Sequence, residues 1–394
     1  MTDARLRRGR GSLALCFLAQ GVAFALLVTR IPAVQDQYGI PDTLLPAFLA
    51  AVPVLAGAGS AATGALVRKV APSRLLRWTQ PVVLLSLLWV GAGDALWEAA
   101  VALGVFGLAV GVLDASMNML GVGLQRAYGR SLMLGFHAWY SLGGIVGASL
   151  AWAGAYRELP LLATCLPAVV VLLPAALVAS RWYVDGKARR APGSAGRVSG
   201  GRALLPLCLV MTFAYIADAT VSNWSAKYLR DVLGGSQELA TVPYGAYAVT
   251  TLLGRAVGDR AVRRFGAVAV VRGGTAVAAA GFAGVAGAPE PWAGLAGFAV
   301  LGLGLSVVVP QTFAAAGRHP AGDVAVARVN ICAYAGFLIG SPLVGAAGEA
   351  WSPRGAMLVP LVLVLLTLRY ARSFAVERDR YGGGHERPHT VDVG

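Results

Sequence analysis

The chain alternates long apolar runs with short polar connections. A transmembrane helix needs about 20 apolar residues to cross the ~30 Å hydrocarbon core of a bilayer. Each long run reaches about that length and is closed by charged residues, proline or glycine. The pattern therefore predicts an all-α integral membrane protein with twelve transmembrane helices. Their predicted ranges are 11–32, 43–67, 75–95, 97–125, 131–155, 158–182, 203–226, 238–258, 266–288, 291–317, 324–348 and 353–371.

Two segments interrupt this pattern. Residues 183–202 are rich in Gly, Ser, Pro and Arg, which predicts a flexible cytoplasmic linker. Residues 372–394 end in YGGGHERPHTVDVG and predict a disordered cytoplasmic tail. The linker divides the helices into two pseudo-symmetric six-helix bundles, at 11–182 and 203–371. The basic N-terminus continues into an apolar run without a small-residue cleavage site, so we expect a retained first helix rather than a signal peptide.

The charge distribution predicts the orientation in the membrane. The chain is 57% hydrophobic and only 13% charged, whereas soluble domains average about 25% charged residues. Its net charge of +14 raises the question of a nucleic-acid partner. However, all but five of the 33 Lys and Arg residues fall on one predicted side. This bias predicts that both termini lie in the cytoplasm of a bacterial cell, with the basic residues at lipid headgroups and no nucleic acid bound. The five exceptions are Arg30, Arg157, Lys227, Arg230 and Arg354.

An internal repeat appears at an offset of about 195 residues. DQYG, ending at Gly39, matches DVLG, ending at Gly234, and RKVAP from Arg68 matches RRFGA from Arg263. FGLAVG from Phe106 matches LGLGLS in the same way. Duplicated six-helix halves related by an axis along the membrane normal are the architecture of a secondary transporter, with the substrate cavity between the halves.

The chain resembles the major facilitator superfamily. GALVRKVAPSR from Gly64 resembles the signature loop of that family, with Arg68 at the position of the usual Asp. GRAVGDRAVRRFG from Gly254 resembles its second copy. TRIPAVQDQYGI, SLMLGFHAWYSLGGIVGA and SNWSAKYLRDVLG are similar to a poorly characterised bacterial inner-membrane subgroup, itself similar to fucose-type sugar–proton symporters. The resemblance implies that the first, fourth, seventh and tenth helices line the cavity.

The signature loops imply candidate gating residues. In the family, their charged groups pair with nearby helix ends and stabilise one access state. Asp259 lies close to Arg260 and Arg264, so these three residues form a candidate latch in the second half. The alternative is that the arginines only fix topology. Arg30 is a further gating candidate, by pairing with Asp36 or Asp231, and the alternative is that it reaches lipid headgroups.

Two acidic residues lie deep in predicted spans, Asp114 and Asp218. A charged side chain at mid-bilayer costs about 3 kcal/mol on insertion scales, so such residues face a cavity or a partner. Both acids are candidates for proton coupling, and the alternative for each is a structural, hydrogen-bonded acid. Asn118, one turn from Asp114, and His137 are expected at a similar depth, so the three form a candidate polar cluster in which histidine titrates near neutral pH. The alternative is a histidine that packs at a tight helix contact.

The remaining polar and aromatic residues of the predicted spans are candidates for solute binding. At positions related by the repeat, the second half replaces titratable groups with neutral ones. We therefore expect the first half to handle the proton and the second to grip the solute. Pairs such as Gly143 and Gly147 predict interfaces that slide. The candidate solute-binding residues are Gln20, Phe24, Asn118, Tyr140, Tyr215, Gln311, Asn330 and Tyr334.

Together these features predict a proton-coupled secondary carrier of a small organic solute that works by alternating access as a monomer. They leave the direction of transport, uptake or efflux, open. The chain has no GxxxxGK[ST] loop for ATP. Its four cysteines lie in apolar runs without metal-ligand spacing, so we expect packing residues and no metal or cofactor. The rival interpretations are a membrane-embedded enzyme, for which catalytic residues are lacking, and a non-transporting sensor, for which docking loops are lacking.

Overall fold

The computed structural model describes residues 3–41, 43–185 and 201–375. Most of the predicted linker and tail, at 186–200 and 376–394, lies outside these ranges. Within them the chain is helical and contains no strand. The long helices are α1 (Asp3–Thr29), α3 (Leu45–Leu66), α4 (Pro72–Ala92), α5 (Leu96–Tyr128), α6 (Met133–Tyr156), α7 (Leu161–Ala179), α8 (Gly201–Lys227), α10 (Val242–Phe265), α11 (Ala267–Gly287), α12 (Pro291–Leu305), α13 (Val308–Ala316), α14 (Asp323–Ala350) and α16 (Leu358–Tyr370).

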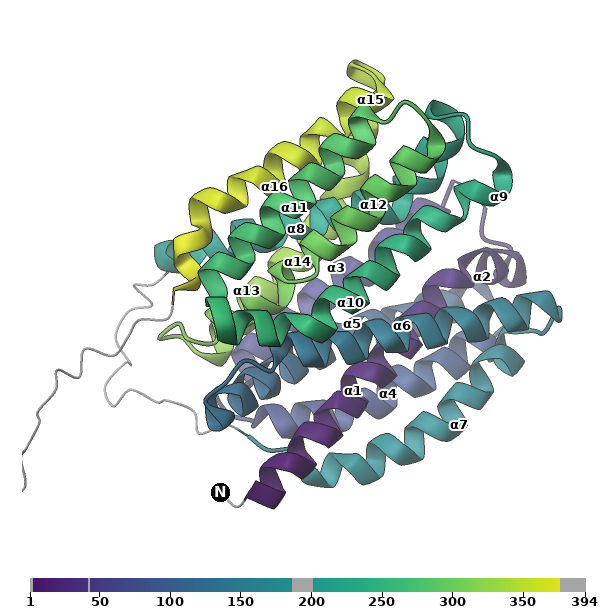
Figure 1. Cartoon of the computed structure of the whole chain (residues 1–394). Helices are drawn as coiled ribbons and strands as arrows, with labels where there is room; N and C mark the ends of the chain where they lie inside the picture. The colour runs from purple at the N-terminus through teal and green to yellow at the C-terminus, as the bar shows by residue number, and fades with distance from the viewer. Residues whose placement is uncertain (1–2, 42, 186–200, 376–394) are drawn as a thin grey trace, which may run out of the picture.

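Short helical segments occupy several connections. They are α2 (Ile31–Tyr38), η1 (Ser180–Trp182), the π-helical turn η2 (Tyr228–Val232), α9 (Gln237–Ala240), α15 (Pro353–Ala356) and η3 (Ala371–Phe374). We call the end of the molecule that holds the start of α1 and the connections at 67–71, 129–132 and 317–322 the basic end. The other end, which holds α2, α9 and α15, we call the opposite end (Figure 1).

Ten helical segments of the described chain are long and apolar enough to cross a membrane. Each predicted span contains a helix, but the spans at 131–155 and 238–258, which became α6 and α10, are not among those ten. Both helices have 24 residues, or about 36 Å at 1.5 Å per residue. They are long enough to cross and fall short only in apolar character. The chain is thus a multi-pass, all-α membrane protein.

The helices pack as two sets that repeat one pattern of neighbours. In the first set, α1–α7, helix α1 lies along α6, α5 lies between α3 and α4, and α4 contacts α7. In the second set, α8–α16, helix α8 lies along α14, α12 lies between α10 and α11, and α11 contacts α16. The two sets meet mainly where α3 contacts α14 and where α6 contacts α10. The order of neighbours is therefore the same in both sets.

Glycines allow the closest helix contacts. The glycine pair that was predicted to form a sliding interface lies inside one set and not between the two sets. A Cβ at Gly143 or Gly147 would lie 2.1 or 2.5 Å from a backbone oxygen of α1, so this pair holds α1 and α6 together inside one set. Between the sets, a Cβ at Gly258 would lie 2.4 Å from Leu134, and one at Gly317 would lie 2.1 Å from Val122. The glycines that bring the two sets together are thus at the basic end.

The predicted tenth span is broken into α12 and α13 at Ser306 and Val307. Pro310 explains the break, because a proline ring cannot donate a backbone hydrogen bond and clashes with the carbonyl four residues earlier. That carbonyl belongs to Ser306. The four cysteines are free, with Cys16 and Cys165 buried, as expected for packing residues.

Candidate transport site

Asp114 and Tyr334 connect the two sets of helices near mid-length. Asp114 lies near the middle of α5, in the first set, and Tyr334 lies on α14, in the second. The Tyr334 hydroxyl donates a short hydrogen bond to Oδ2 of Asp114. Both side chains are half-buried. The acid that the sequence singled out is therefore held by a partner from the other half of the chain.

Asn118 and His137 form a buried pair next to Asp114. Their side chains are 2% and 7% exposed, and Nε2 of His137 lies 3.2 Å from Oδ1 of Asn118. The imidazole stacks on Phe313 with ring centroids 5.9 Å apart and tilts against Phe17 at 5.4 Å. Asn118 donates to the backbone oxygen of Asp114, at 2.9 Å, and not to its carboxylate. The predicted cluster is assembled, but His137 is packed between aromatic rings and reaches Asp114 only through Asn118.

Asp218 is held inside the second set. Its Oδ1 accepts a hydrogen bond of 2.6 Å from the hydroxyl of Tyr247 on α10. Tyr247 is buried and stacks on Tyr244, with ring centroids 6.3 Å apart. Asp218 and its tyrosine partner therefore belong to the same half of the chain.

Arg255 lies on α10, in the second set. Its Nη1 donates to Oγ of Ser141 on α6, across the two sets, at 2.6 Å. Its Nε is buried and has no acceptor. No carboxylate of the described residues lies within 4.0 Å of the guanidinium. The guanidinium lies in the neighbourhood of Asp218, and of Tyr140 and Tyr215 from the two different sets. A half-buried cation with an unpartnered donor thus lies near Asp218 and several tyrosines.

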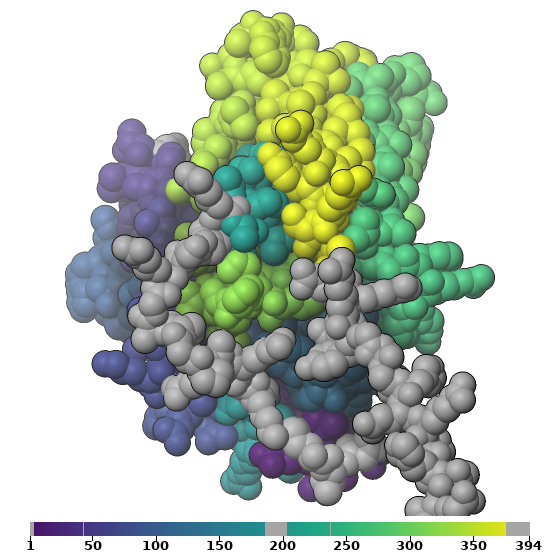
Figure 2. Space-filling view, turned by 90° about the vertical axis from the view of Figure 1, so that its left-hand side faces the viewer, coloured from purple at the N-terminus to yellow at the C-terminus, as the bar shows by residue number. Residues whose placement is uncertain are grey.

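The basic end is closed by contacts between the two sets. Asp259 on α10 accepts hydrogen bonds from Oγ of Ser131, at 2.6 Å, and from the backbone N–H of Gly135, at 2.8 Å. Gly135 lies in the first turn of α6, where a carboxylate satisfies free N–H groups and interacts favourably with the helix dipole. Arg263 donates to the Ser131 carbonyl. Figure 2 faces this end, where lime atoms of the second set border blue atoms of the first.

A second contact closes the basic end on the other side of the molecule. Asn330 on α14 donates to Oγ of Ser60 on α3, at 3.3 Å, and Ser60 donates to the carbonyl of Ala327. In the described ranges, the hydrogen bonds between the two sets run from this level to the Asp114–Tyr334 pair and the Arg255–Ser141 pair. Among the described residues, no hydrogen bond joins the two sets between the level of these two pairs and the opposite end of the molecule.

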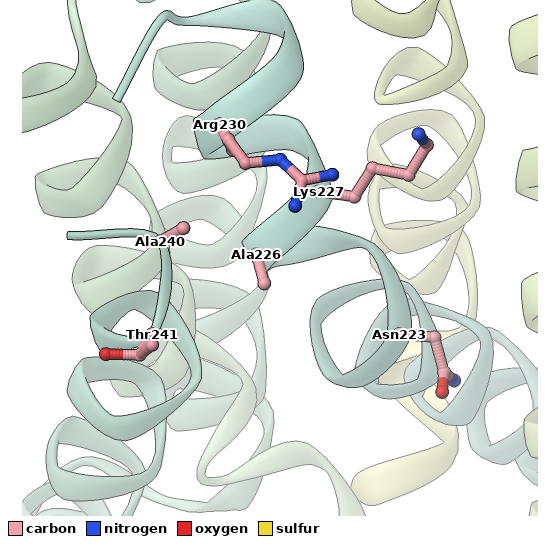
Figure 3. Close-up of a pocket in the computed structure, with 6 residues that line it drawn as sticks. All are labelled: Asn223, Ala226, Lys227, Arg230, Ala240 and Thr241. Carbon is pink, nitrogen blue, oxygen red and sulfur yellow. The ribbon is translucent and has the colours of Figure 1, made fainter. Parts of the chain in front are cut away.

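A groove of about 310 Å³ lies at the opposite end, within the second set. Asn223, Lys227 and Arg230 come from the end of α8 and from η2, and Ala240 and Thr241 face them from α9 (Figure 3). Lys227 and Arg230 both pair with Asp231, each at 2.6 Å. None of the predicted site residues lines this groove, so it lies outside the candidate site.

The family model described as Major Facilitator Superfamily matches residues 207–386. An uncharacterized MFS-type transporter of Yersinia pestis is 30% identical over 371 residues, which cover 92% of this chain and 94% of that protein. The chain belongs to the major facilitator superfamily. Membrane protein MosC of Rhizobium meliloti is also similar, with 26% identity over 96% of this chain and 92% of that protein.

Solved structures confirm the fold of this major facilitator superfamily protein. FucP in its outward conformation superposes with a TM-score of 0.79 at 17% identity, over 93% of this chain and 98% of that one. The proton:xylose symporter XylE, bound to 6-bromo-6-deoxy-D-glucose, gives a TM-score of 0.71 at 14% identity, over 94% and 96%. By family the chain is a membrane transporter, as its signature loops predicted.

The predicted solute-binding residues occupy two kinds of environment. Phe24, Tyr140, Tyr215 and Tyr334 are half-buried. Gln20 and Gln311 are 2% exposed, and Oε1 of Gln20 and Nε2 of Gln311 lack partners. These two amides therefore keep unused hydrogen-bonding capacity inside the protein.

Five predicted site residues lie in surroundings that differ from the expected ones. Asn330 contacts α3 at the closed basic end, because its helical face turns toward the other set. Asp259 binds the start of α6 rather than Arg260 or Arg264, and both arginines are exposed. Arg30 donates to the carbonyl of Leu159, at 2.9 Å, and its predicted pairing with Asp36 or Asp231 is not found among the described residues.

Arg255 and Tyr247 were missed by sequence reasoning. The sequence predicts that the eighth span ends at residue 258 and places Arg255 among the charges that flank the membrane. Helix α10 in fact continues to Phe265, which places Arg255 well inside the helix. An arginine within GRAVGDR, following an aromatic-rich stretch that contains Tyr244 and Tyr247, is the signal that could have found the site.

Proposed function

We propose that this transporter is a proton-coupled secondary carrier of a small, hydroxyl-bearing organic solute, working by alternating access in the bacterial cytoplasmic membrane. The observation that carries the proposal is the hydrogen bond between Asp114 and Tyr334, because it places the deepest acid of one half against the other half. A change in the charge of Asp114 is then felt directly at the contact between the two sets.

In this proposal the chain crosses the membrane twelve times, with both termini in the cytoplasm. The ten apolar spans are completed by α6 and α10, whose length suffices and whose polar residues include Ser141, Arg255 and Asp259. Polar groups inside a membrane protein belong at a cavity or at a partner, and these two helices contact each other. The arginines of the connections at the basic end assign that end to the cytoplasm.

The described conformation corresponds to a state that is closed toward the cytoplasm. The contacts of Asp259 and Asn330 with the first set provide the closure. The two sets, 11–182 and 203–371 in the predicted bounds, would act as rocking units that part at the basic end after closing at the opposite end. The likeness to FucP in its outward conformation, although it is a likeness of fold, supports this assignment.

Asp114 is the proposed proton carrier. A proton arriving from the opposite end adds to its carboxylate, which then no longer accepts the Tyr334 hydrogen bond as an anion. Neutralisation lowers the cost of enclosing this carboxyl group when the chamber closes. When the basic end opens, water re-enters and the proton leaves to the cytoplasm, so one proton crosses with each turnover. The Asn118–His137 pair holds the α5 backbone in place below the acid.

The solute is proposed to bind beside Asp114 through aromatic faces and hydrogen bonds. Tyr140 and Tyr334 supply rings and hydroxyl groups from the two sets, Tyr215 adds a third ring, and Nε of Arg255 supplies a free donor. Gln20 and Gln311 carry the unused amide groups described above. A guanidinium has five N–H donors in a planar fork, and hydroxyl oxygens of a solute are suitable acceptors for them.

The test is solute-driven proton movement into proteoliposomes that contain a pH-sensitive dye. The panel holds L-fucose, D-xylose, inositols, sugar acids and amino sugars, each added to vesicles without an imposed gradient. We expect at least one of these solutes to acidify or alkalinise the lumen, and the sign gives symport or antiport. Transport of a labelled panel member with no proton movement at any pH would contradict the coupling, and no transport of any member would contradict the solute class.

A further inference from the structure

A groove of about 340 Å³ lies at the basic end, between α1 and the end of α7. Arg8, Gly11, Ser12 and Leu15 line it from α1, spaced three and four residues apart on one helix face. Ala179 and Trp182 line it from the end of α7 and from η1. The groove belongs to the first set and shares no residue with the candidate transport site.

Ser12 carries an unused hydroxyl in this groove. Its side chain is only 5% exposed, and its Oγ has no hydrogen-bond partner. Serine and threonine hydroxyls within helices usually bond to the carbonyl four residues earlier, as Thr63 and Ser149 do here. The Ser12 hydroxyl does not, so a buried donor is left for a ligand. A side chain at Gly11 would meet nothing within 4 Å, so the groove is open at Gly11, the neighbour of Ser12.

The charge and the rim of the groove indicate the ligand. Arg8 is exposed and makes no ion pair with any described residue. Trp182 is 41% exposed, and the neighbouring Leu177 and Val178 of α7 are exposed apolar residues that continue the lipid-facing surface up to the groove. Tryptophan is enriched at the level of lipid headgroups, and basic pockets between helices on the cytoplasmic side bind anionic headgroups.

We propose that this groove binds an anionic phospholipid, with the phosphate held by Arg8 and the Ser12 hydroxyl and the glycerol and upper acyl chains against Leu15 and Trp182. Free phosphate shares the polar part of this chemistry but gains nothing from the apolar rim. The inference rests on the chain being a membrane protein and on the proposed cytoplasmic location of the basic end, and it is independent of proton coupling. Because the groove lies between α1 and the end of α7, a bound lipid would contact both helices and stabilise their packing.

The experiment uses the full-length protein, purified in detergent and stripped of lipid. Binding of fluorescent phosphatidylglycerol is measured by anisotropy, with phosphatidylcholine and inorganic phosphate as competitors. We expect competition by unlabelled phosphatidylglycerol and little by phosphatidylcholine or phosphate at equal concentration. Arg8→Gln should weaken binding about fivefold, the contribution of one basic residue at a lipid surface. Ser12→Ala, which adds no bulk, should weaken it about threefold, as expected for one modest hydrogen bond.

Arg10→Gln is the matched control, because Arg10 is exposed on the same helix but does not line the groove. Equal binding by the Arg8→Gln and Arg10→Gln variants would overturn the proposal, as would equal competition by phosphatidylcholine. Competition by inorganic phosphate as strong as that by phosphatidylglycerol would assign the groove to free phosphate instead. Size-exclusion profiles that match the wild type ensure that a loss of binding is not a loss of folding.

Discussion

The two deep acids of this transporter differ in where their partners come from. Asp114, on α5, accepts its hydrogen bond from Tyr334 of the other set, whereas Asp218, on α8, accepts from Tyr247 of its own set. A bond inside one set survives when the sets move as units, but a bond between sets must break and re-form. The chain thus places two similar carboxyl groups in different mechanical positions, and only Asp114 is suited to sense a change of access of the kind proposed.

The largest expected effect separates these two acids. Asp114→Asn should reduce proton-driven accumulation of the solute found in the panel to the level of empty vesicles, because an amide cannot carry the proton. Asp218→Asn should reduce it by no more than about tenfold, since it weakens a hydrogen bond worth about 1 kcal/mol. Accumulation under an imposed pH gradient is the measurement, with solute exchange as the check that Asp114→Asn still binds and moves solute. The opposite ranking of the two variants would reverse the assignment.

A second prediction tests whether the second set holds the solute. Arg255→Gln removes the unpartnered Nε and the charge, and hydrogen bonds to charged groups contribute about 1.5–3 kcal/mol. Solute affinity should therefore fall roughly ten- to a hundredfold, measured by equilibrium binding at a pH where Asp114 is protonated. Arg255→Lys keeps the charge but loses the planar fork, so it should recover only part of the affinity.

Arg260→Gln is the control for this experiment, because Arg260 lies on the same helix but is exposed. Its affinity should equal that of the wild type. If Arg255→Gln bound the solute as tightly as Arg260→Gln does, Arg255 would act only as a structural contact of Ser141.

The smallest expected effect concerns the contacts between the two sets that close the basic end. Gly317→Leu places a side chain where a Cβ would already lie 2.1 Å from Val122, and overpacking costs about 1–3 kcal/mol. Because the two contacting segments belong to different sets, they can relieve the clash by separating. We expect a larger population with longer distances between spin labels at positions 130 and 264, measured by double electron–electron resonance. Gly273→Leu, where a Cβ meets nothing within 4 Å, should leave the distribution unchanged.

The fold was predictable because apolar runs of membrane length leave the backbone few alternatives. Without water, a chain in the hydrocarbon core must satisfy its own backbone groups, and a helix does so locally. Each predicted span therefore contains a helix, including the one that Pro310 divides. Ends were less predictable: α10 extends beyond residue 258 because Asp259 is held by the other set and needs no water. A hydropathy pattern does not reveal a contact of this kind, between Asp259 and a helix of the other set.

The candidate site was predictable only where a residue type is rare in its surroundings. Asp114 is the only charged residue of its apolar run, which singles it out. Asn118 and His137 are predicted from their expected closeness to Asp114. Asn330 and Tyr334 are one helical turn apart on α14, and the sequence gives no reason to separate them. Yet Asn330 contacts Ser60 at the closed basic end, whereas Tyr334 contacts Asp114. The neighbour that each face of a helix contacts depends on how the two sets pack. The residues around a single position do not reveal that neighbour.

The bond between Asp259 and the Gly135 N–H also gives the molecule its own reporter. A carboxylate from one half covers a backbone amide at the start of a helix in the other half. This amide has no intrahelical acceptor to protect it, so its proton exchanges with deuterium only when the two halves part. The exchange rate at this single position therefore reports how often the basic end opens, in the unlabelled protein and with any solute, lipid or pH applied to it.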